Sequence, residues 1–304
     1  MRLTTTSDTT NTGTIWFNPT LNRIQYSYFG GVWSAGGALI SGRQQLAGAG
    51  TQNAGLAFGG NISGPSVSCT EEYNGSSWSA GGSLITARSF LAGAGTQNAG
   101  LSFGGQSPAG VGSCTEEYNG SSWSAGGALS TARYNLAGAG TQNAGLAFGG
   151  YIGSPSFSNV SCTEEYDGTS WTAGGALITA RRNLAGSGTQ NAGLAFGGLA
   201  GPSTVGCTEE YNGSSWSVGG SLITARCSLA GAGTQDAGLA FGGNFPAVSC
   251  TEEYNGSSWS TGGALITARS GLAGAGTQNA GLAFGGTVCL CTEEYNTAIQ
   301  TCTL

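Results

Sequence analysis

The chain repeats one sequence unit every 43–48 residues. The unit is clearest at Leu91–Trp123, which reads LAGAGTQNAGLSFGGQSPAGVGSCTEEYNGSSW. Nearly the same string starts at Leu46, Leu136, Leu184 and Leu229, and a shortened copy starts at Leu272. A fixed period of this length is the signature of a repeat architecture, in which each unit buries its apolar surface against its neighbours. The 304 residues are therefore expected to form one array, although their number alone would suggest two domains.

Each unit is predicted to fold into four short antiparallel strands. In the unit that begins at Thr86, these strands cover 89–95, 99–103, 114–118 and 122–124, with a loop at 106–113. Asn119-Gly120 is expected to be a two-residue type I′ turn, because that turn needs positive φ at both central positions. Four such strands per unit are typical of a propeller blade. The sequence thus predicts an all-β, six-bladed propeller whose Ala/Gly-rich first strands lie innermost, where backbones approach closely.

The two ends of the chain are expected to close the ring. Trp33 precedes the first of six Arg-led strands, so the last unit lacks a Trp strand of its own and Trp33 would supply it. In the competing closure, Ile299–Leu304 form the outer strand and residues 14–33 pack elsewhere. We predict an attachment segment at 1–23, consisting of an arm and a hairpin around Asn18–Asn22, and a propeller at 24–304.

Charge and composition exclude several classes of protein. The chain has no Lys and no His, and its net charge is −6, so a basic face for nucleic acid is not expected. No run of 18 apolar residues is present, so no membrane insertion is expected. Without His, a Ser-His-Asp triad and His-ligated zinc or copper sites are impossible. We therefore expect no enzyme activity, no cofactor and no metal site.

Six of the nine Cys occupy one repeat position, directly before Thr-Glu-Glu-Tyr. Equivalent positions in successive units point the same way and are expected to lie too far apart to bridge. We interpret them as small buried thiols of a protein made in a reducing compartment. A bridge between Cys289 and Cys302 is left open by the spacing.

The Glu-Glu pair of each unit has a structural interpretation. Neighbouring side chains on a strand point to opposite faces, so the two carboxylates cannot share one substrate proton. We expect one Glu of each pair, such as Glu116, to bind the guanidinium of an Arg such as Arg88, and the other to be solvated. Tyr118, Trp123 and Trp33 are expected to fill the outer part of the blades.

The units differ from one another in two places, which predicts a variable face. One is the loop after Gly-Gly, and the other is the pair of residues after each Arg. In a four-stranded blade both lie on the same side of the disc, around the mouth of the channel. Such variation indicates either relaxed constraint on surface loops or a binding face on a rigid scaffold. Because aromatic residues and Arg dominate interfaces, the predicted anchors are Phe90, Tyr134, Tyr151, Phe157, Arg182 and Phe245.

The order of signals in each unit resembles the kelch repeat. That family has an apolar strand ending in Gly-Gly, then a Tyr, then a Trp, which correspond here to Phe103-Gly104-Gly105, Tyr118 and Trp123. The resemblance covers residues 24–304 and implies a β-propeller, but it says little about activity, because propellers host many functions. The copper oxidases that share this propeller need His ligands, so their activity is not implied here.

Gly13–Trp33 resembles short hairpin modules of bacteriophage tail-fibre and other virion proteins. The resemblance implies a non-enzymatic virion component in the tail, fibre or surface decoration, made in the host cytoplasm and part of a multi-subunit assembly. The arm would bind other virion proteins, and the variable face would meet a host-surface glycan or protein. The alternatives are a soluble intracellular kelch-type interaction scaffold and a glycan-active enzyme.

Overall fold

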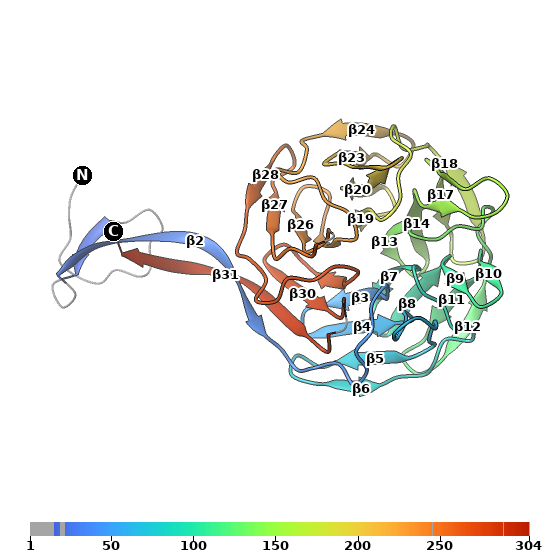
Figure 1. The fold of residues 1–304 in the computed structure, drawn as a ribbon, viewed down its shortest axis with the longest axis horizontal. Coiled ribbons are helices and arrows are strands. Elements are labelled where there is room, and N and C mark those ends of the chain that lie inside the picture. Colours follow the sequence, from blue (N-terminus) through green and yellow to red (C-terminus); the bar gives the residue numbers. More distant parts are fainter. Residues whose placement is uncertain (1–14, 19–21, 245, 288, 304) are drawn as a thin grey trace.

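Six antiparallel four-stranded blades form a closed ring, and a two-stranded ribbon leaves the edge of that ring (Figure 1). The computed structural model describes residues 15–18, 22–244, 246–287 and 289–303. The predicted arm at 1–13 lies outside these residues. No helix occurs among the residues described, so none is present that could cross a membrane.

The strands follow the same order in each blade, from the channel outwards. The first three blades are β3 (Ala47–Thr51), β4 (Ala54–Phe58), β5 (Thr70–Tyr73) and β6 (Trp78–Ala80); β7 (Ala92–Thr96), β8 (Ala99–Phe103), β11 (Thr115–Tyr118) and β12 (Trp123–Gly126); and β13 (Ala137–Thr141), β14 (Ala144–Phe148), β17 (Thr163–Tyr166) and β18 (Trp171–Gly174). The fourth and fifth are β19 (Ala185–Thr189), β20 (Ala192–Phe196), β23 (Thr208–Tyr211) and β24 (Trp216–Gly219); and β25 (Ala230–Gly233), β26 (Gly238–Phe241), β27 (Thr251–Tyr254) and β28 (Trp259–Thr261). The predicted fold class is confirmed.

The sixth blade joins the two ends of the chain. It contains β29 (Ala273–Gly276), β30 (Ala280–Phe284), β31 (Thr292–Thr303) and β2 (Arg23–Ala35), and β1 (Ile15–Asn18) pairs with the start of β2. Trp33 lies opposite Tyr295, so the Trp33 strand closes the ring. The competing closure is wrong, because Ile299 pairs with Phe29 in the ribbon beyond the disc (Figure 1).

Glycine in the innermost strands lets neighbouring blades approach. A Cβ on Gly93 would lie 2.6 Å from the ring of Phe58 and 2.9 Å from the carbonyl oxygen of Gly48, both in the preceding blade. No real Cβ tolerates such contacts, so Gly alternates with Ala along these strands. The alternation that predicted an innermost strand therefore reflects packing between blades.

The hydrophobic core is divided into layers between adjacent blades. In one layer, Leu56 and Phe58 of the first blade pack with Leu91, Tyr118 and Trp123 of the second. Each such burial contributes roughly 1.5–3 kcal/mol relative to exposure. Because the layers are shared, no blade is expected to be stable alone.

The turn between the third and fourth strands differs from the prediction. Tyr118 pairs directly with Trp123, so a four-residue loop joins them, and only the Gly of Asn119-Gly120 has positive φ, at 88°. The type I′ turn is therefore wrong. The Asn119 side chain accepts hydrogen bonds from the backbone N–H groups of Ser121 and Ser122 at 3.0 and 2.9 Å. Asp167 accepts equivalent bonds in the third blade, which explains why Asp replaces Asn there.

Three of the loops predicted after Gly-Gly contain small hairpins. They are formed by β9 (Gln106–Ser107) with β10 (Gly110–Val111), β15 (Tyr151–Ile152) with β16 (Ser158–Asn159), and β21 (Leu199–Ala200) with β22 (Ser203–Thr204). Single backbone bridges link each hairpin to the residue after the repeated Arg, for example Tyr134 to Tyr151 and Arg182 to Leu199. The two variable segments of a unit therefore lie together on one face.

Candidate functional site

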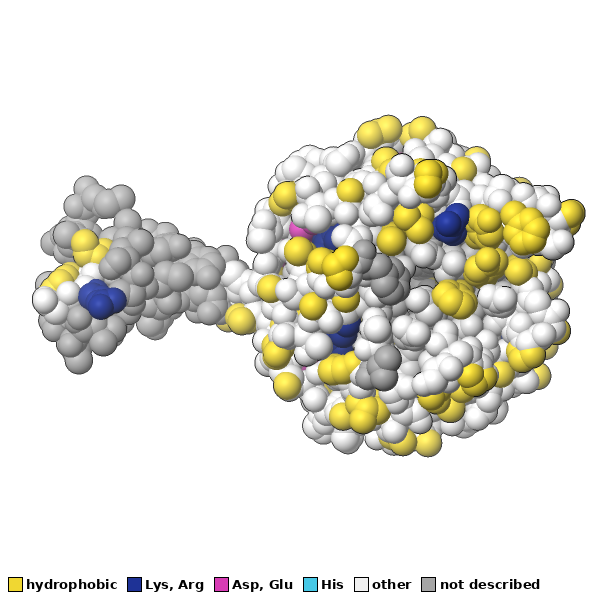
Figure 2. Space-filling model, in the orientation of Figure 1, with side chains coloured by type: hydrophobic (Ala, Val, Ile, Leu, Met, Phe, Trp, Pro, Cys, Tyr) yellow, Lys and Arg dark blue, Asp and Glu magenta, His cyan; other side chains and the backbone are white. Residues whose placement is uncertain are grey.

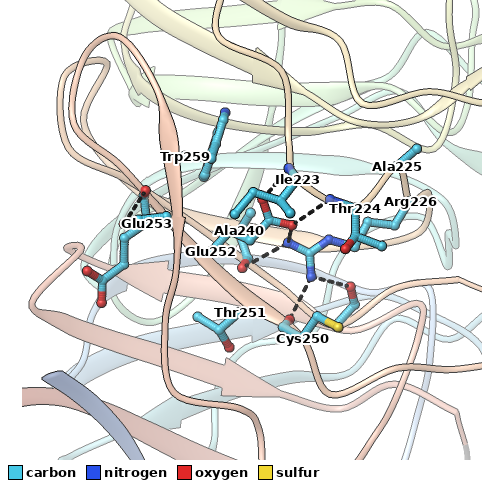
Figure 3. Close-up of polar contacts among 12 residues, drawn as sticks. Ile223, Thr224, Ala225, Arg226, Ala240, Cys250, Thr251, Glu252, Glu253 and Trp259 are labelled. Carbon is cyan, nitrogen blue, oxygen red and sulfur yellow. Dashed lines mark hydrogen bonds and ion pairs between the residues drawn. The ribbon is translucent and has the colours of Figure 1, made fainter.

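Each blade contains a buried Arg–Glu ion pair. In the second blade, Nη2 of Arg88 lies 2.9 Å from Oε1 of Glu116, and the two side chains are only 1% and 3% exposed. Arg88 also donates to the carbonyl oxygen of Cys114 at 2.7 Å, and Glu116 accepts from the N–H of Ile85 at 2.7 Å. Burial lowers the pKa of the Arg88 guanidinium, and the Glu116 carboxylate opposes that shift. Figure 3 shows the equivalent pair, Arg226 and Glu252, with the same kinds of partners.

The second Glu of each pair is not simply solvated, contrary to our expectation. The hydroxyl of Tyr118 donates to Oε1 of Glu72 in the preceding blade at 2.6 Å and accepts from the N–H of Gly82 at 3.3 Å. Burial and the hydrogen bond to Glu72 raise the pKa of Tyr118 to about 12. Equivalent Tyr–Glu bonds join every pair of neighbouring blades, including the last and the first.

Two further contacts between blades complete this repeated layer. Nε1 of Trp123 donates to Oγ1 of Thr70 at 2.9 Å, and Trp33 makes the same bond to Thr251. The side-chain amide of Gln97 donates to the carbonyl oxygens of Gly55 and Tyr73 at 3.0 and 2.7 Å. No contact of Gln97 was predicted. We use the name inter-blade layer for these Tyr, Glu, Trp, Thr and Gln contacts between blades together with the Arg–Glu pair that lies beside them in each blade.

The mouth of the channel carries a closed ring of backbone hydrogen bonds that sequence reasoning missed. Its members stand two residues after each Arg and have positive φ: Gln45, Phe90, Asn135, Asn183, Ser228 and Gly271. Each donates its N–H to the carbonyl oxygen of the member in the preceding blade at 2.7–2.9 Å. Five residue types occupy these six positions, so only the recurring position could have indicated the ring. The ring fixes the backbone from which the variable side chains project.

Four predicted anchors form one continuous cluster on the variable face. The rings of Phe90 and Tyr134 have centroids 6.0 Å apart, and those of Tyr134 and Tyr151 are 5.6 Å apart, both edge to face. The guanidinium carbon of Arg182 lies 4.5 Å from the centroid of the Tyr151 ring. These residues come from three neighbouring blades, so the backbone bridges and the ring at the mouth bring together side chains that are distant in sequence.

A shallow cavity of about 580 Å³ adjoins this aromatic cluster. Tyr134, Phe157 and Pro155 line it together with Gln106 and Val111. Phe157 is 63% exposed, which is unusual for a Phe that only stabilises a fold. Figure 2 shows hydrophobic side chains gathered over this part of the disc, near β9 and β10. The remaining predicted anchor, Phe245, lies outside the described residues.

Exposed isoleucines surround the same face and were not predicted. They lie in the connections from the outer strand of one blade to the inner strand of the next, and are 57–62% exposed: Ile40, Ile85, Ile178, Ile223 and Ile266. In the third unit, Ser130 takes this place, and its hydroxyl donates to Glu164 at 2.6 Å. Each is one exposed apolar side chain of its unit, and the position recurs around the disc.

The cysteines differ from their predicted environment. Cys114 is exposed, and four equivalent cysteines are half-buried: Cys69, Cys162, Cys207 and Cys250. At these positions it is the backbone carbonyl oxygen, not the thiol, that makes the repeated contact, since it accepts a hydrogen bond from the first Gly of the Gly-Gly pair. Cys289 forms a disulfide with Cys291, so the bridge to Cys302 is not formed. Within the described ranges, no three Cys, Asp or Glu side chains group closely enough to hold a metal ion.

The fold and this surface define a β-propeller, a class whose rigid disc suits a scaffold for protein binding. No model of a known protein family matches the sequence, and no curated protein matches it either.

Proposed function

We propose that this chain is a non-enzymatic binding component of a bacteriophage particle, in its tail, fibre or surface decoration. The observation that carries the proposal is the separation of the ribbon from the variable face. β2 and β31 leave the edge of the disc side by side, so among the described residues this ribbon does not lie over the variable face (Figure 1). The ribbon and arm would attach the disc to other virion proteins, and the face would meet a host-surface glycan or protein.

The proposal treats the repeated units as kelch repeats. The Gly-Gly pair supports this assignment, because Gly104 and Gly105 have φ of 64° and 96°, which other residues rarely adopt. Tyr118 and Trp123 follow in the kelch order and pack against each other in the inter-blade layer.

A binding role rather than catalysis is supported by the use of the acidic residues. The buried Glu of each unit is held by an Arg, and the half-buried Glu accepts a bond from a Tyr. Carboxylates committed in this way have little freedom to act as general acids or bases.

The experiment is sedimentation of intact particles through a density gradient, followed by mass spectrometry of the particle band. We expect the protein at stoichiometric amounts in particles. A variant lacking residues 1–22 keeps β2 and its closure of the ring, so it is expected to fold and to be absent from particles. Arg182→Gln is the matched control, because it changes the variable face and leaves the ribbon intact. This variant is expected to be incorporated into particles normally.

A wild-type protein that stays at the top of the gradient as a soluble monomer contradicts the virion proposal. That result would favour the second candidate, an intracellular kelch-type interaction scaffold. The ring of exposed isoleucines on the variable face is the observation that suits such a scaffold.

A further inference from the structure

The variable face carries an unusually placed positive charge. Six of the nine Arg are used in the buried Arg–Glu pairs. Arg23 lies on the ribbon, and Arg2 lies outside the described residues. Over the part of the disc that the structure describes, Arg182 is thus the one cation outside those pairs. In a chain of net charge −6, a half-buried cation on the predicted binding face calls for an explanation.

Arg182 is held in place from two sides. Its Nη1 donates to Oδ1 of Asn159 at 2.7 Å, and its guanidinium lies over the ring of Tyr151. Asn159 is itself fixed, because its amide donates to the carbonyl oxygen of Leu199 at 2.8 Å. A guanidinium has five N–H donors, so the bond to Asn159 leaves most of them for a ligand. A planar, fixed guanidinium suits a carboxylate, which it can bind through two parallel hydrogen bonds.

Tyr151 and Tyr134 connect Arg182 to the cavity, because Arg182 lies over Tyr151 and Tyr151 contacts Tyr134. Burial and the neighbouring Tyr151 raise the pKa of Tyr134, while the charge of Arg182 opposes that shift, so all three groups are within electrostatic reach. Tyr134 also lines the cavity, as does Phe157. Its lining contains no acidic residue that would repel an anion, and Gln106, Ser154 and Ser156 supply polar groups. Its volume of about 580 Å³ lies within the range of roughly 300–1,000 Å³ of small-ligand sites.

We propose that this surface binds an acidic glycan, with a sugar carboxylate on Arg182 and a neighbouring sugar in the cavity beside Tyr134 and Phe157. The C–H bonds on one face of a sugar ring carry partial positive charge and suit the negative face of an aromatic ring. Sugar hydroxyls would bond to Gln106, Ser154 and Ser156. The inference rests on the proposed function and names the class of host-surface molecule that the face contacts.

An acidic peptide fits this surface less well. Binding several carboxylates along a peptide needs several cations, and one Arg is present among exposed aromatic rings and hydroxyl groups. The two ligand classes nevertheless share the carboxylate, so the experiment compares them directly.

The experiment uses calorimetric titration of the purified full chain, so particle association plays no part in the result. The probes are 3′-sialyllactose with lactose as its neutral match, trigalacturonic acid with its methyl ester, and tetraglutamate. We expect at least one acidic sugar to bind tenfold or more tightly than its neutral match. Arg182→Gln should remove that preference, and Phe157→Ser should weaken both members of the pair.

Gln44→Ala supplies the matched control, because Gln44 occupies the position of Arg182 in the first unit. It should bind the acidic sugar like the unaltered protein. Three results would overturn the proposal: equal affinity for the acidic and neutral members of both pairs, an acid preference that survives in Arg182→Gln, or tetraglutamate binding as tightly as the better acidic sugar. Each result leaves the gradient experiment unaffected, so failure of the glycan proposal and of the virion proposal can be told apart.

Discussion

Arg181 and Arg182 are neighbours in sequence but belong to two differently built regions. Arg181 belongs to the inter-blade layer, where it is fully buried and its Nη1 lies 3.2 Å from Oε1 of Glu209. Arg182 belongs to the variable face, where it lies over Tyr151. The inter-blade layer repeats the same residues in every blade, whereas the variable face differs from blade to blade. The comparison teaches that repetition marks the residues that hold the ring, and departure from repetition marks those that the ring leaves free to vary.

The largest effect is expected from opening the ring in the inter-blade layer. Trp33→Ala removes a side chain that packs against the rings of Phe241 and Tyr295 and donates to Thr251. We expect a loss of about 3–5 kcal/mol in the free energy of unfolding, measured with urea, as for other buried Trp residues. Trp123→Ala, at the equivalent position within the chain, should cost a similar amount. If Trp33→Ala costs much less than Trp123→Ala, Trp33 does not close the ring in the way described.

A smaller loss is expected from crowding two innermost strands. Gly93→Ala places a Cβ 2.6 Å from Phe58, and overpacking of this kind costs about 1–3 kcal/mol. Gly112→Ala is the matched control on the variable face, because its nearest atom would be 3.6 Å away. Thermal unfolding should show a lower midpoint for Gly93→Ala and no clear change for Gly112→Ala. Equal midpoints would contradict the claim that the innermost strands are packed more closely than the variable face.

Alkaline pH is expected to weaken the inter-blade layer. The pKa of Tyr118 is 10.0 when unperturbed and about 12 in the folded protein, so the folded state holds the phenolic proton more tightly. The resulting stabilisation is fully present below pH 10 and is lost as the pH rises toward 12. Tyr118→Phe should lower stability at pH 8 by about 1 kcal/mol and make the alkaline decline less steep. An unchanged alkaline decline in this variant would contradict the role of the Tyr–Glu bonds.

The smallest effect on stability is expected on the variable face. Phe157→Ser changes a side chain that is 63% exposed, so the free energy of unfolding should move by less than about 0.5 kcal/mol. Urea unfolding of this variant beside the unaltered chain measures the difference. A loss above 2 kcal/mol would place Phe157 among the residues that hold the fold.

The repeat period was enough to predict the blades and the closure by Trp33, because both follow from counting equivalent strands. The innermost strands followed from their Gly/Ala alternation, which allows close approach of backbones. The hydrogen bonds of individual side chains were harder to predict. Asn119 accepts backbone N–H groups, which makes a four-residue loop where Asn-Gly suggested a tighter turn. Glu72 binds Tyr118 of the next blade, a contact between units that the order of residues within one unit does not show.

The sequence predicted which segments form the variable face, but not which of their side chains contact one another. The differences between units indicated Tyr134, Tyr151 and Arg182 separately. Their contact depends on the bridge between Tyr134 and Tyr151 and on the ring of backbone hydrogen bonds at the channel mouth. Neither has a residue signature, because Gln, Phe, Asn, Ser and Gly all occupy the ring.

The most direct test of the division between the inter-blade layer and the variable face is the free energy of unfolding of Arg181→Gln and Arg182→Gln, measured side by side in urea. Arg181→Gln leaves the Glu209 carboxylate buried without its cation, and we predict a loss of about 3–5 kcal/mol. Arg182→Gln removes one contact with Tyr151 and one hydrogen bond to Asn159 on the variable face, and we predict a loss of about 1 kcal/mol or less. Equal losses, or a greater loss for Arg182→Gln, would contradict the account.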